Sequence, residues 1–409
     1  MNTSRTIALA SLVAFATQVA FALLMLRLFT PREVGEFSVI SQIGFFWMTL
    51  ALAQSNLGLL ANQHVPASLA ARQAWRASAM RGLCLLPLAA LAVWFSQLSL
   101  GPALVWALLL AFCQMGWMLA QSFTLRAGSA WEQAAVRVLP PATAAACALT
   151  AALLGASFGW DGPVLLLAAL LGYAVGAAWL VPAFRARSEQ SLATSVKDEF
   201  SATTQQSDPR SAALRMAHTL VDALLATAII VVWQRLYGAE ETGWMSAQLR
   251  VLGFVPAVVH MAWAQVALAQ GDKPRQAAWV SPWWVGLGAF ACVGLLGLAC
   301  VTALHLGWLE PKWSGVLGYV VPLVVWQGSA CLSAAFSHRP FQARSACAYS
   351  WACMGLGVIQ VVVLMAPMGL AQPADAVPHM SAFAVISGLG LLGLTVWMSQ
   401  LRGRKKSST

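Results

Sequence analysis

Charged residues are scarce in this 409-residue chain. Lys, Arg, Asp and Glu make up only 9% of it, against about 25% in a soluble domain. This scarcity excludes a soluble enzyme, a disordered protein and a nucleic-acid binder with a grafted membrane anchor, because too little polar surface remains to coat a water-soluble body. The chain also lacks G-x-x-x-x-G-K-[ST] and H-E-x-x-H sequences, and none of its eight cysteines has CxxC or metal-ligand spacing. We therefore expect no P-loop nucleotide hydrolysis, no metal, no cofactor and no catalytic residues.

Hydrophobic residues, in contrast, make up 59% of the chain and gather in twelve apolar stretches. These stretches lie near residues 7–29, 37–60, 82–98, 101–124, 138–157, 162–182, 213–235, 243–269, 279–304, 315–337, 347–368 and 379–400. A membrane-spanning helix takes about 20 residues. The pattern predicts an all-α polytopic membrane protein with twelve transmembrane helices.

The basic residues lie mainly on one side of this topology. Of the 24 Lys and Arg, 19 fall on the side of both termini, four fall on the opposite side, and Arg250 lies within a helix. Because basic residues collect on cytoplasmic loops, we expect both termini in the cytoplasm.

One long polar segment, 183–212, divides the twelve stretches into two sets of six. It is rich in Ser, Thr and Gln and has no apolar period, which is typical of a flexible cytoplasmic linker. A helix lying on the lipid surface is the alternative. We predict an N-terminal lobe over 1–182, a C-terminal lobe over 213–400 and a basic cytoplasmic tail over 401–409.

The two predicted lobes share a motif. Residues 27–35 and 235–243 both follow Arg-Leu-aromatic-x-x-x-Glu-x-Gly, at an offset of 208, and each copy lies between the first and second helix of its lobe. Because the offset spans six helices, both copies face the same side of the membrane. This predicts a parallel repeat related by an axis along the membrane normal.

The stretches from Leu28 to Phe37 and from Leu57 to Leu59 resemble the opening of polysaccharide flippases, such as those for O-antigen and exopolysaccharide. These proteins belong to the multidrug/oligosaccharidyl-lipid/polysaccharide exporter superfamily. Gly243, Ala247 and Arg250 fit the family's eighth helix, although Met245 replaces an aromatic residue. The resemblance implies two six-helix lobes around a central cavity that opens alternately to each side. It also implies carriage of an isoprenyl-pyrophosphate-linked oligosaccharide across the bacterial inner membrane.

Expected partners are therefore the lipid-linked oligosaccharide, membrane lipids, and a polysaccharide polymerase with glycosyltransferases. We expect no nucleic-acid partner.

Asp222 is the only acidic residue well inside a predicted helix, and His218 precedes it by one turn on the same face. A carboxylate and an imidazole that face a cavity can exchange a proton and bias the two lobe arrangements. The alternative is a structural polar pair.

Basic residues are candidates for the pyrophosphate, since a guanidinium can hold phosphate bidentately. Arg250 lies seven residues into its helix, and its repeat counterpart is the polar Gln42. Arg27 and Arg235 end their helices near the outer surface. Snorkelling or anchoring of a helix end is the alternative for these arginines.

Neutral amides can bind sugar hydroxyls, or can join helices by hydrogen bonds. Gln18 and Asn56 are the two leading candidates for sugar binding. The others are Gln54, Gln114, Gln248, Gln265, Gln327 and Gln360. His260 and His305 are interpreted as packing residues.

Three other functions stay open. A drug or cation antiporter of the same superfamily would need acidic residues within the N-terminal lobe, and none is embedded there. A peptidoglycan-precursor flippase of this kind usually has two more helices. An integral-membrane glycosyltransferase, or a non-transporting assembly scaffold, would need larger outer loops.

Overall fold

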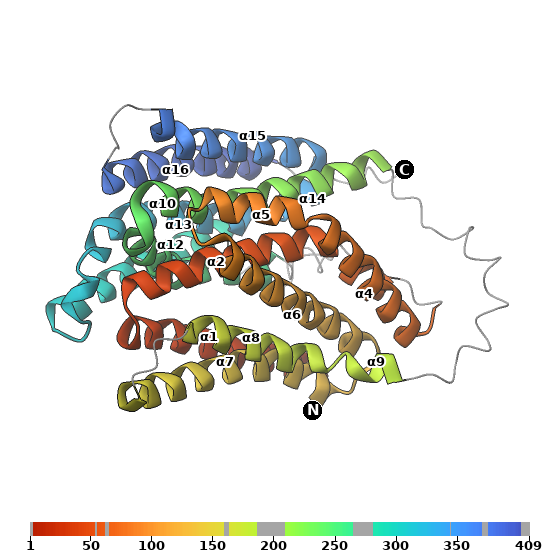
Figure 1. The fold of residues 1–409 in the computed structure, drawn as a ribbon. Helices are drawn as coiled ribbons and strands as arrows, with labels where there is room; N and C mark the ends of the chain where they lie inside the picture. Colours follow the sequence, from red (N-terminus) through yellow and green to blue (C-terminus); the bar gives the residue numbers. More distant parts are fainter. Residues whose placement is uncertain are drawn as a thin grey trace, which may run out of the picture. The chain divides into compact units, whose positions relative to one another are not determined.

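A computed structural model describes residues 3–53, 55–61, 65–158, 163–185, 209–264, 281–343, 345–369 and 375–401. All regular structure in these ranges is helical (Figure 1). Gln54, Gln265, most of the predicted linker and nearly all of the predicted tail lie outside the described residues.

The chain divides into two compact units. The first contains Met1–Phe29 and Glu36–Ala212, and the second contains Thr30–Gly35 and Ala213–Thr409. Helices up to residue 185 are α1 (Thr3–Leu28), α2 (Pro31–Leu52), α3 (Ser55–Ala61), α4 (Ala67–Cys84), α5 (Leu86–Phe95), α6 (Leu100–Ala127), α7 (Ala130–Phe158), α8 (Val164–Ala178) and α9 (Val181–Arg185). The later ones are α10 (Pro209–Val258), η1 (Val259–Ala264), α12 (Pro282–His305), η2 (Pro311–Trp313), α13 (Val316–Phe336), α14 (Arg339–Gln342), α15 (Ala346–Met365), η3 (Ala366–Gly369) and α16 (Ala376–Gln400).

The predicted multi-pass, all-helical membrane fold is confirmed. Within the described ranges, eight helices are long and apolar enough to cross a membrane, and there are nine if α4 and α5, which are bent by 49°, are taken together as one broken span. One of the eight is α10, which overlaps two of the predicted stretches, and Ala16–Leu28 and Val164–Ala178 are shorter apolar helices. Within the described residues, each of the twelve predicted stretches overlaps a helix.

The helix that leads into the predicted third stretch begins at Ala67, whereas the stretch itself is predicted from residue 82. The predicted stretches leave Arg72, Arg76 and Arg81 in the loop between residues 60 and 82, but these residues lie on α4. The small residues of α4, such as Ala71 and Gly82, are buried against the rest of the unit. Tertiary packing therefore stabilises this helix, which the hydropathy of its sequence does not predict. The bend follows from Pro87 at the start of α5, because proline cannot continue the hydrogen bonds of α4.

Two helices start with a reciprocal capping box. At the start of α2, the backbone N–H and the hydroxyl of Thr30 both donate to the Glu33 carboxylate, at 2.7 Å each. At the start of α7, Ser129 and Glu132 repeat the arrangement at 2.6 and 2.9 Å. Each box satisfies N–H groups that a helix start otherwise leaves unpaired. Because α7 starts at Ala130, Arg137 lies on a helix, although the predicted stretches 101–124 and 138–157 leave it in the loop between them.

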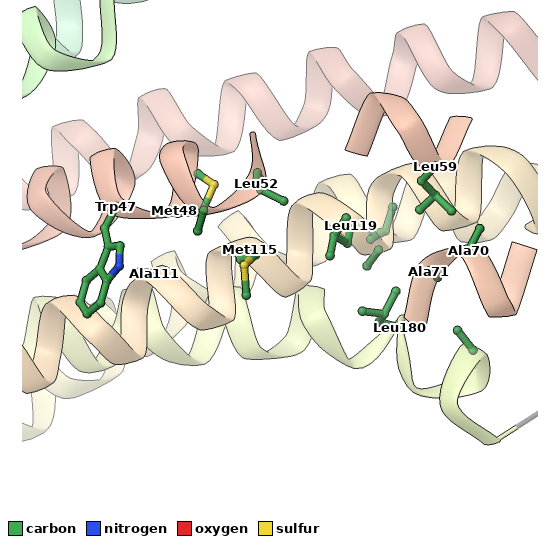
Figure 2. Packing of buried hydrophobic residues seen from close by; sticks show 14 of the residues in the cluster. Trp47, Met48, Leu52, Leu59, Ala70, Ala71, Ala111, Met115, Leu119 and Leu180 are labelled. Carbon is green, nitrogen blue, oxygen red and sulfur yellow. The ribbon is translucent and has the colours of Figure 1, made fainter. Parts of the chain in front are cut away.

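The core of the first unit is built on α2, α4 and α6 (Figure 2). Trp47 is the largest buried side chain of this cluster, at 2% exposure, and its indole Nε1–H donates to the carbonyl of Gly82 at 2.7 Å. This hydrogen bond ties α2 to α4 just before the bend and satisfies the buried indole N–H. Elsewhere in the unit, α7 packs on α1 and α8, and α6 packs on α8.

The two repeat glycines meet in the second unit, where Thr30–Gly35 packs against α10. A Cβ placed on Gly35 would lie 2.9 Å from the carbonyl carbon of Ala239 and 3.0 Å from the nitrogen of Gly243. A Cβ placed on Gly243 would lie 2.9 Å from the Cα of Pro31. Since Pro31 and Ala239 are themselves 208 residues apart, the two contacts are equivalent. This reciprocity supports the internal repeat predicted from the sequence.

Gly238 separates the two halves of α10. Its backbone has φ 83° and ψ −178°, a combination adopted almost only by glycine. The residue at the same position of the first repeat is Thr30, which instead starts α2 with a capping box. The second repeat therefore turns between its first two helices through backbone conformation alone.

A buried polar network lies next to this turn. The Trp233 indole N–H donates to the Tyr319 hydroxyl at 3.1 Å, and the Tyr319 hydroxyl donates to the Glu241 carboxylate. His379 stacks on Trp233 with ring centroids 4.9 Å apart, and its Nδ1 lies 2.9 Å from the Tyr237 hydroxyl. The network joins both halves of α10 to α13 and α16.

Replacing Tyr319 by phenylalanine is expected to destabilise the protein by about 2–3 kcal/mol, because an acidic acceptor and a buried indole donor lose their partner. Thermal unfolding in detergent measures the effect. Ser381→Ala is the control, since that exposed hydroxyl bonds only within its own helix. Equal midpoints for Tyr319→Phe and wild type would contradict a stabilising role for the network.

Candidate functional site

The first half of α10 carries the predicted carboxylate–imidazole pair. His218 Nε2 lies 3.3 Å from Asp222 Oδ2, across one helical turn. The Asp222 side chain is 63% exposed, whereas that of His218 is only 21% exposed. The pair predicted from spacing is therefore formed, with the carboxylate on the accessible side and the imidazole packed behind it.

Helix α15 supports this pair from the side. The Tyr349 ring meets the His218 ring edge to face, with centroids 5.9 Å apart, and Phe341 packs on Tyr349 at 6.1 Å. The ring contact holds the His218 imidazole beside Tyr349 on α15.

A second histidine follows α10. His260 lies on η1, a π-helical turn that directly follows α10, and it is exposed. Its Nδ1 lies 3.3 Å from the Ser337 hydroxyl at the end of α13. The fold brings His260 to Ser337, 77 positions away, which is a contact that the sequence does not predict. No pattern in the sequence signals this, since η1 can be recognised only from the backbone.

The other candidates lie on separate helices. Arg250 is half-buried on the second half of α10, and Arg235 is half-buried just before Gly238. Gln18, Gln42 and Asn56 are half-buried on α1, α2 and α3. Arg27 is exposed in the last turn of α1. Half-burial suits residues that bind a ligand, since the side chain is partly fixed and still accessible.

Several of the further amides are buried in packing. Gln248 is 2% exposed, Gln360 is 5% exposed and Gln327 is 8% exposed. This burial favours helix–helix contacts over sugar binding for these three residues.

The described residues offer acid–base chemistry and no metal site. Among them, no group of three or more His, Cys, Asp and Glu side chains is placed to hold a metal ion. A carboxylate with an imidazole at 3.3 Å can accept, share and release a proton.

Comparisons with known proteins identify structures with a similar fold. No protein-family model and no curated protein matches the chain. A structure titled "Lipid II flippase MurJ, inward closed conformation" is similar, with a TM-score of 0.63 at 9% identity over 96% of this chain and 87% of that chain.

Two transporter structures are also similar. An inward-facing multidrug resistance MATE family transporter of the MOP superfamily has a TM-score of 0.46 at 13% identity, covering 98% of this chain and 96% of its own. The MATE transporter ClbM in complex with Rb+ has a TM-score of 0.39 at 13% identity, covering 98% and 93%. The first comparison carries the conclusion: this chain is a multi-pass membrane protein with the helical fold of that flippase structure.

Proposed function

We propose that the chain is a flippase that moves an isoprenyl-pyrophosphate-linked oligosaccharide across the bacterial inner membrane, by alternating access, for surface polysaccharide biosynthesis. The observation that carries the proposal is the fold shared with a lipid II flippase structure over 96% of this chain. The internal repeat supports it, because two equivalent halves are typical of carriers that expose one site to each side in turn. The Lys and Arg distribution supports cytoplasmic termini.

In this proposal, Arg250 binds the pyrophosphate. Its guanidinium is held within a span, where a fixed positive charge is costly unless it has a function or a partner. Gln42 is the repeat counterpart and provides a neutral polar group at the equivalent position of α2. Arg27 and Arg235, at the ends of their predicted spans, bind phosphate late in transport. Gln18 and Asn56 bind sugar hydroxyls.

Transport needs a free-energy source, because binding alone cannot drive net movement against a gradient. The Asp222–His218 pair provides one if proton binding favours one of the two lobe arrangements. The 3.3 Å contact between the two side chains supports this role, since a carboxylate beside an imidazole can accept and release a proton.

A vesicle assay tests the proposed function. Purified protein is reconstituted with an isoprenyl-pyrophosphate-linked oligosaccharide whose sugar carries a dithionite-sensitive fluorophore. Dithionite bleaches the outer leaflet at once, and protein-dependent flipping makes the inner-leaflet fluorophore accessible as well. A second set of vesicles contains similarly labelled lipid II. Flipping of lipid II alone would overturn the assignment to polysaccharide synthesis. Activity on soluble sugar donors without flipping would identify an enzyme instead.

Replacing Arg250 by glutamine is expected to slow flipping about 10- to 100-fold, since a hydrogen bond to a charged group contributes about 1.5–3 kcal/mol. Arg250→Lys is expected to retain part of the rate, because it keeps the charge and loses the bidentate geometry. Arg76→Gln is the matched control, since Arg76 is exposed on α4. Equal rates for both glutamine variants, with equal unfolding temperatures, would remove Arg250 from the site.

A further inference from the structure

Helix α4 carries three positive charges in a part of the chain that lacks acidic residues. The charges are those of Arg72, Arg76 and Arg81, and the sequence contains no Asp or Glu between Glu36 and Glu132. Arg81 is half-buried, and it forms no ion pair with any residue that the structure describes. A half-buried charge without an opposite charge is costly, so such a residue indicates a site for an anion.

Arg81 lies where the outward surface of α4 changes from polar to apolar. Gln73 and Arg76 are exposed in the first part of the helix, whereas Met80 and Leu83, in the last part, are 62% and 54% exposed. Such a change is typical of the boundary between lipid headgroups and hydrocarbon. The 22 residues of α2 extend about 33 Å, one hydrocarbon thickness, and end beside Arg81. The predicted topology assigns this end to the cytoplasmic side, at the depth of lipid phosphates.

The polypeptide also breaks beside Arg81. Helix α2 ends at Leu52 and α3 begins at Ser55, and Ala53 between them has φ 40°. A positive φ strains a residue with a Cβ, and such strain often accompanies a ligand site. After the break, the Ser55 hydroxyl accepts a hydrogen bond from Arg81 Nη2 at 2.5 Å, and the Ser78 hydroxyl accepts one from the same nitrogen at 3.3 Å. The guanidinium is thus held by neutral groups that leave its charge uncompensated.

One nitrogen of this guanidinium is not used. Arg81 Nε donates to the carbonyl of Ala77 at 3.1 Å and Nη2 donates to the two hydroxyls, but no described residue accepts a hydrogen bond from Nη1. Arg126 on α6 is different, because its Nη1 and Nη2 donate to the backbone carbonyls of Leu59 and Val65. Arg126 therefore fixes the backbone around α3, whereas Arg81 is fixed and still has two N–H groups for a ligand.

We propose that Arg81 binds the phosphate groups of the lipid-linked substrate at the inner face of the membrane, before Arg250 binds them. This inference rests on the proposed function and adds a loading site in the first unit. A guanidinium binds phosphate through charge-assisted hydrogen bonds, and Nη1 provides them here. Asn56, proposed above to bind sugar hydroxyls, directly follows Ser55 in the chain. The candidate for the sugar therefore adjoins the candidate for the phosphate.

The experiment measures binding of an isoprenyl pyrophosphate without sugar to the full-length protein in phosphatidylcholine nanodiscs. Wild type is compared with Arg81→Gln, Arg81→Lys and Ser55→Ala, each with and without Arg250→Gln. Arg76→Gln is the matched control, because it removes the same charge from an exposed position of the same helix. A parallel titration uses phosphatidylglycerol, which offers a phosphate without the isoprenyl chain. Unfolding midpoints are measured for every variant.

We expect Arg81→Gln to weaken binding of the isoprenyl pyrophosphate about 10- to 100-fold in the Arg250→Gln background. Arg81→Lys is expected to weaken it about three- to tenfold, because lysine keeps the charge and loses the bidentate geometry. Ser55→Ala is expected to change it less than about threefold, since the guanidinium remains. In the vesicle assay, Arg81→Gln should raise the substrate concentration that gives half the maximal rate and leave the maximal rate nearly unchanged, as expected for a residue that acts in loading.

Several outcomes would overturn this inference. The first is equal affinity of Arg81→Gln and Arg76→Gln for the isoprenyl pyrophosphate. The second is equal weakening by Ser55→Ala and Arg81→Gln, because the contact between α3 and α4 would then be what matters. The third is an equal loss of phosphatidylglycerol binding, which would identify a site for bulk lipid. If Arg81→Gln does not fold, wild-type affinity of Arg81→Lys overturns the inference instead.

The proposed function can fail separately. Wild-type protein that binds the isoprenyl pyrophosphate through Arg81 and moves no lipid overturns the flippase proposal and supports the phosphate site. Protein that moves the lipid-linked oligosaccharide, with the same concentration dependence in wild type and Arg81→Gln, overturns the loading site alone.

Discussion

Replacing Gly243 by alanine is expected to destabilise the protein by about 3 kcal/mol, because the added methyl group meets the backbone of Pro31 rather than a side chain that can move. A Cβ at this position would lie 2.5 Å from the carbonyl carbon of Pro31. The segment Thr30–Gly35 and the second half of α10 must therefore separate. Thermal unfolding in detergent, followed by size-exclusion chromatography, measures the loss.

Gly355→Ala is the matched control for this prediction. Gly355 lies in the middle of α15, where an added Cβ meets nothing within 4 Å. Alanine there is expected to be neutral or to stabilise by about 0.5–1 kcal/mol, because glycine is the poorer helix former. The two substitutions thus have opposite expected signs. Because Gly35 and Gly243 fix the same crossing, adding Gly35→Ala to Gly243→Ala should cost less than the sum of the single effects. Strict additivity, or equal midpoints for Gly243→Ala and Gly355→Ala, would show that the crossing is not close.

Replacing Asp222 by asparagine is expected to abolish the dependence of transport on a pH gradient. A proton gradient of one pH unit supplies about 1.4 kcal/mol per proton, so a carrier coupled to one proton distributes its substrate about tenfold unequally. Asparagine keeps the size of the side chain and cannot bind the proton. The variant should therefore exchange labelled lipid between leaflets and should not accumulate it. Leaflet distribution in vesicles with an imposed pH gradient measures the effect.

Asp375→Asn provides the control for this substitution. Asp375 is an exposed carboxylate directly before α16, so the change in charge is the same and the site is different. If a pH gradient drives Asp222→Asn to accumulate as much labelled lipid as Asp375→Asn does, Asp222 is not a coupling residue. Loss of accumulation in both variants would point to a general effect of net charge.

The helical spans could be predicted because apolar length depends on nearby residues in the sequence. The exception is α4, where Arg72, Arg76 and Arg81 lower the hydropathy of a segment that packs through Ala71 and Gly82. The repeat could also be recognised from the sequence, because its motif contains glycines that are needed for close backbone contact. The role of Glu241, however, cannot be predicted from the repeat. The matching Glu33 caps its own helix, whereas Glu241 accepts a hydrogen bond from Tyr319, 78 residues away.

Only those contacts of the candidate site that join residues close in the sequence could be predicted. His218 and Asp222 meet across one helical turn, so their spacing alone indicates the contact. The contact of His260 with Ser337 depends on a π turn and on the end of α13, and the amides Gln248 and Gln327 depend on which face of each helix is covered. Helical period predicts neighbours within one element, whereas burial between elements depends on the tertiary arrangement.

The assignment of Thr30–Gly35 to the second unit means that this unit is incomplete without residues from the first half of the polypeptide. A fragment that starts after the polar segment would lack the backbone of Pro31, against which Gly243 packs. During synthesis, the later helices can complete this crossing only after the first two are already in the membrane. An exchange of halves between related proteins should therefore succeed only when residues 30–35 come from the same protein as the second half.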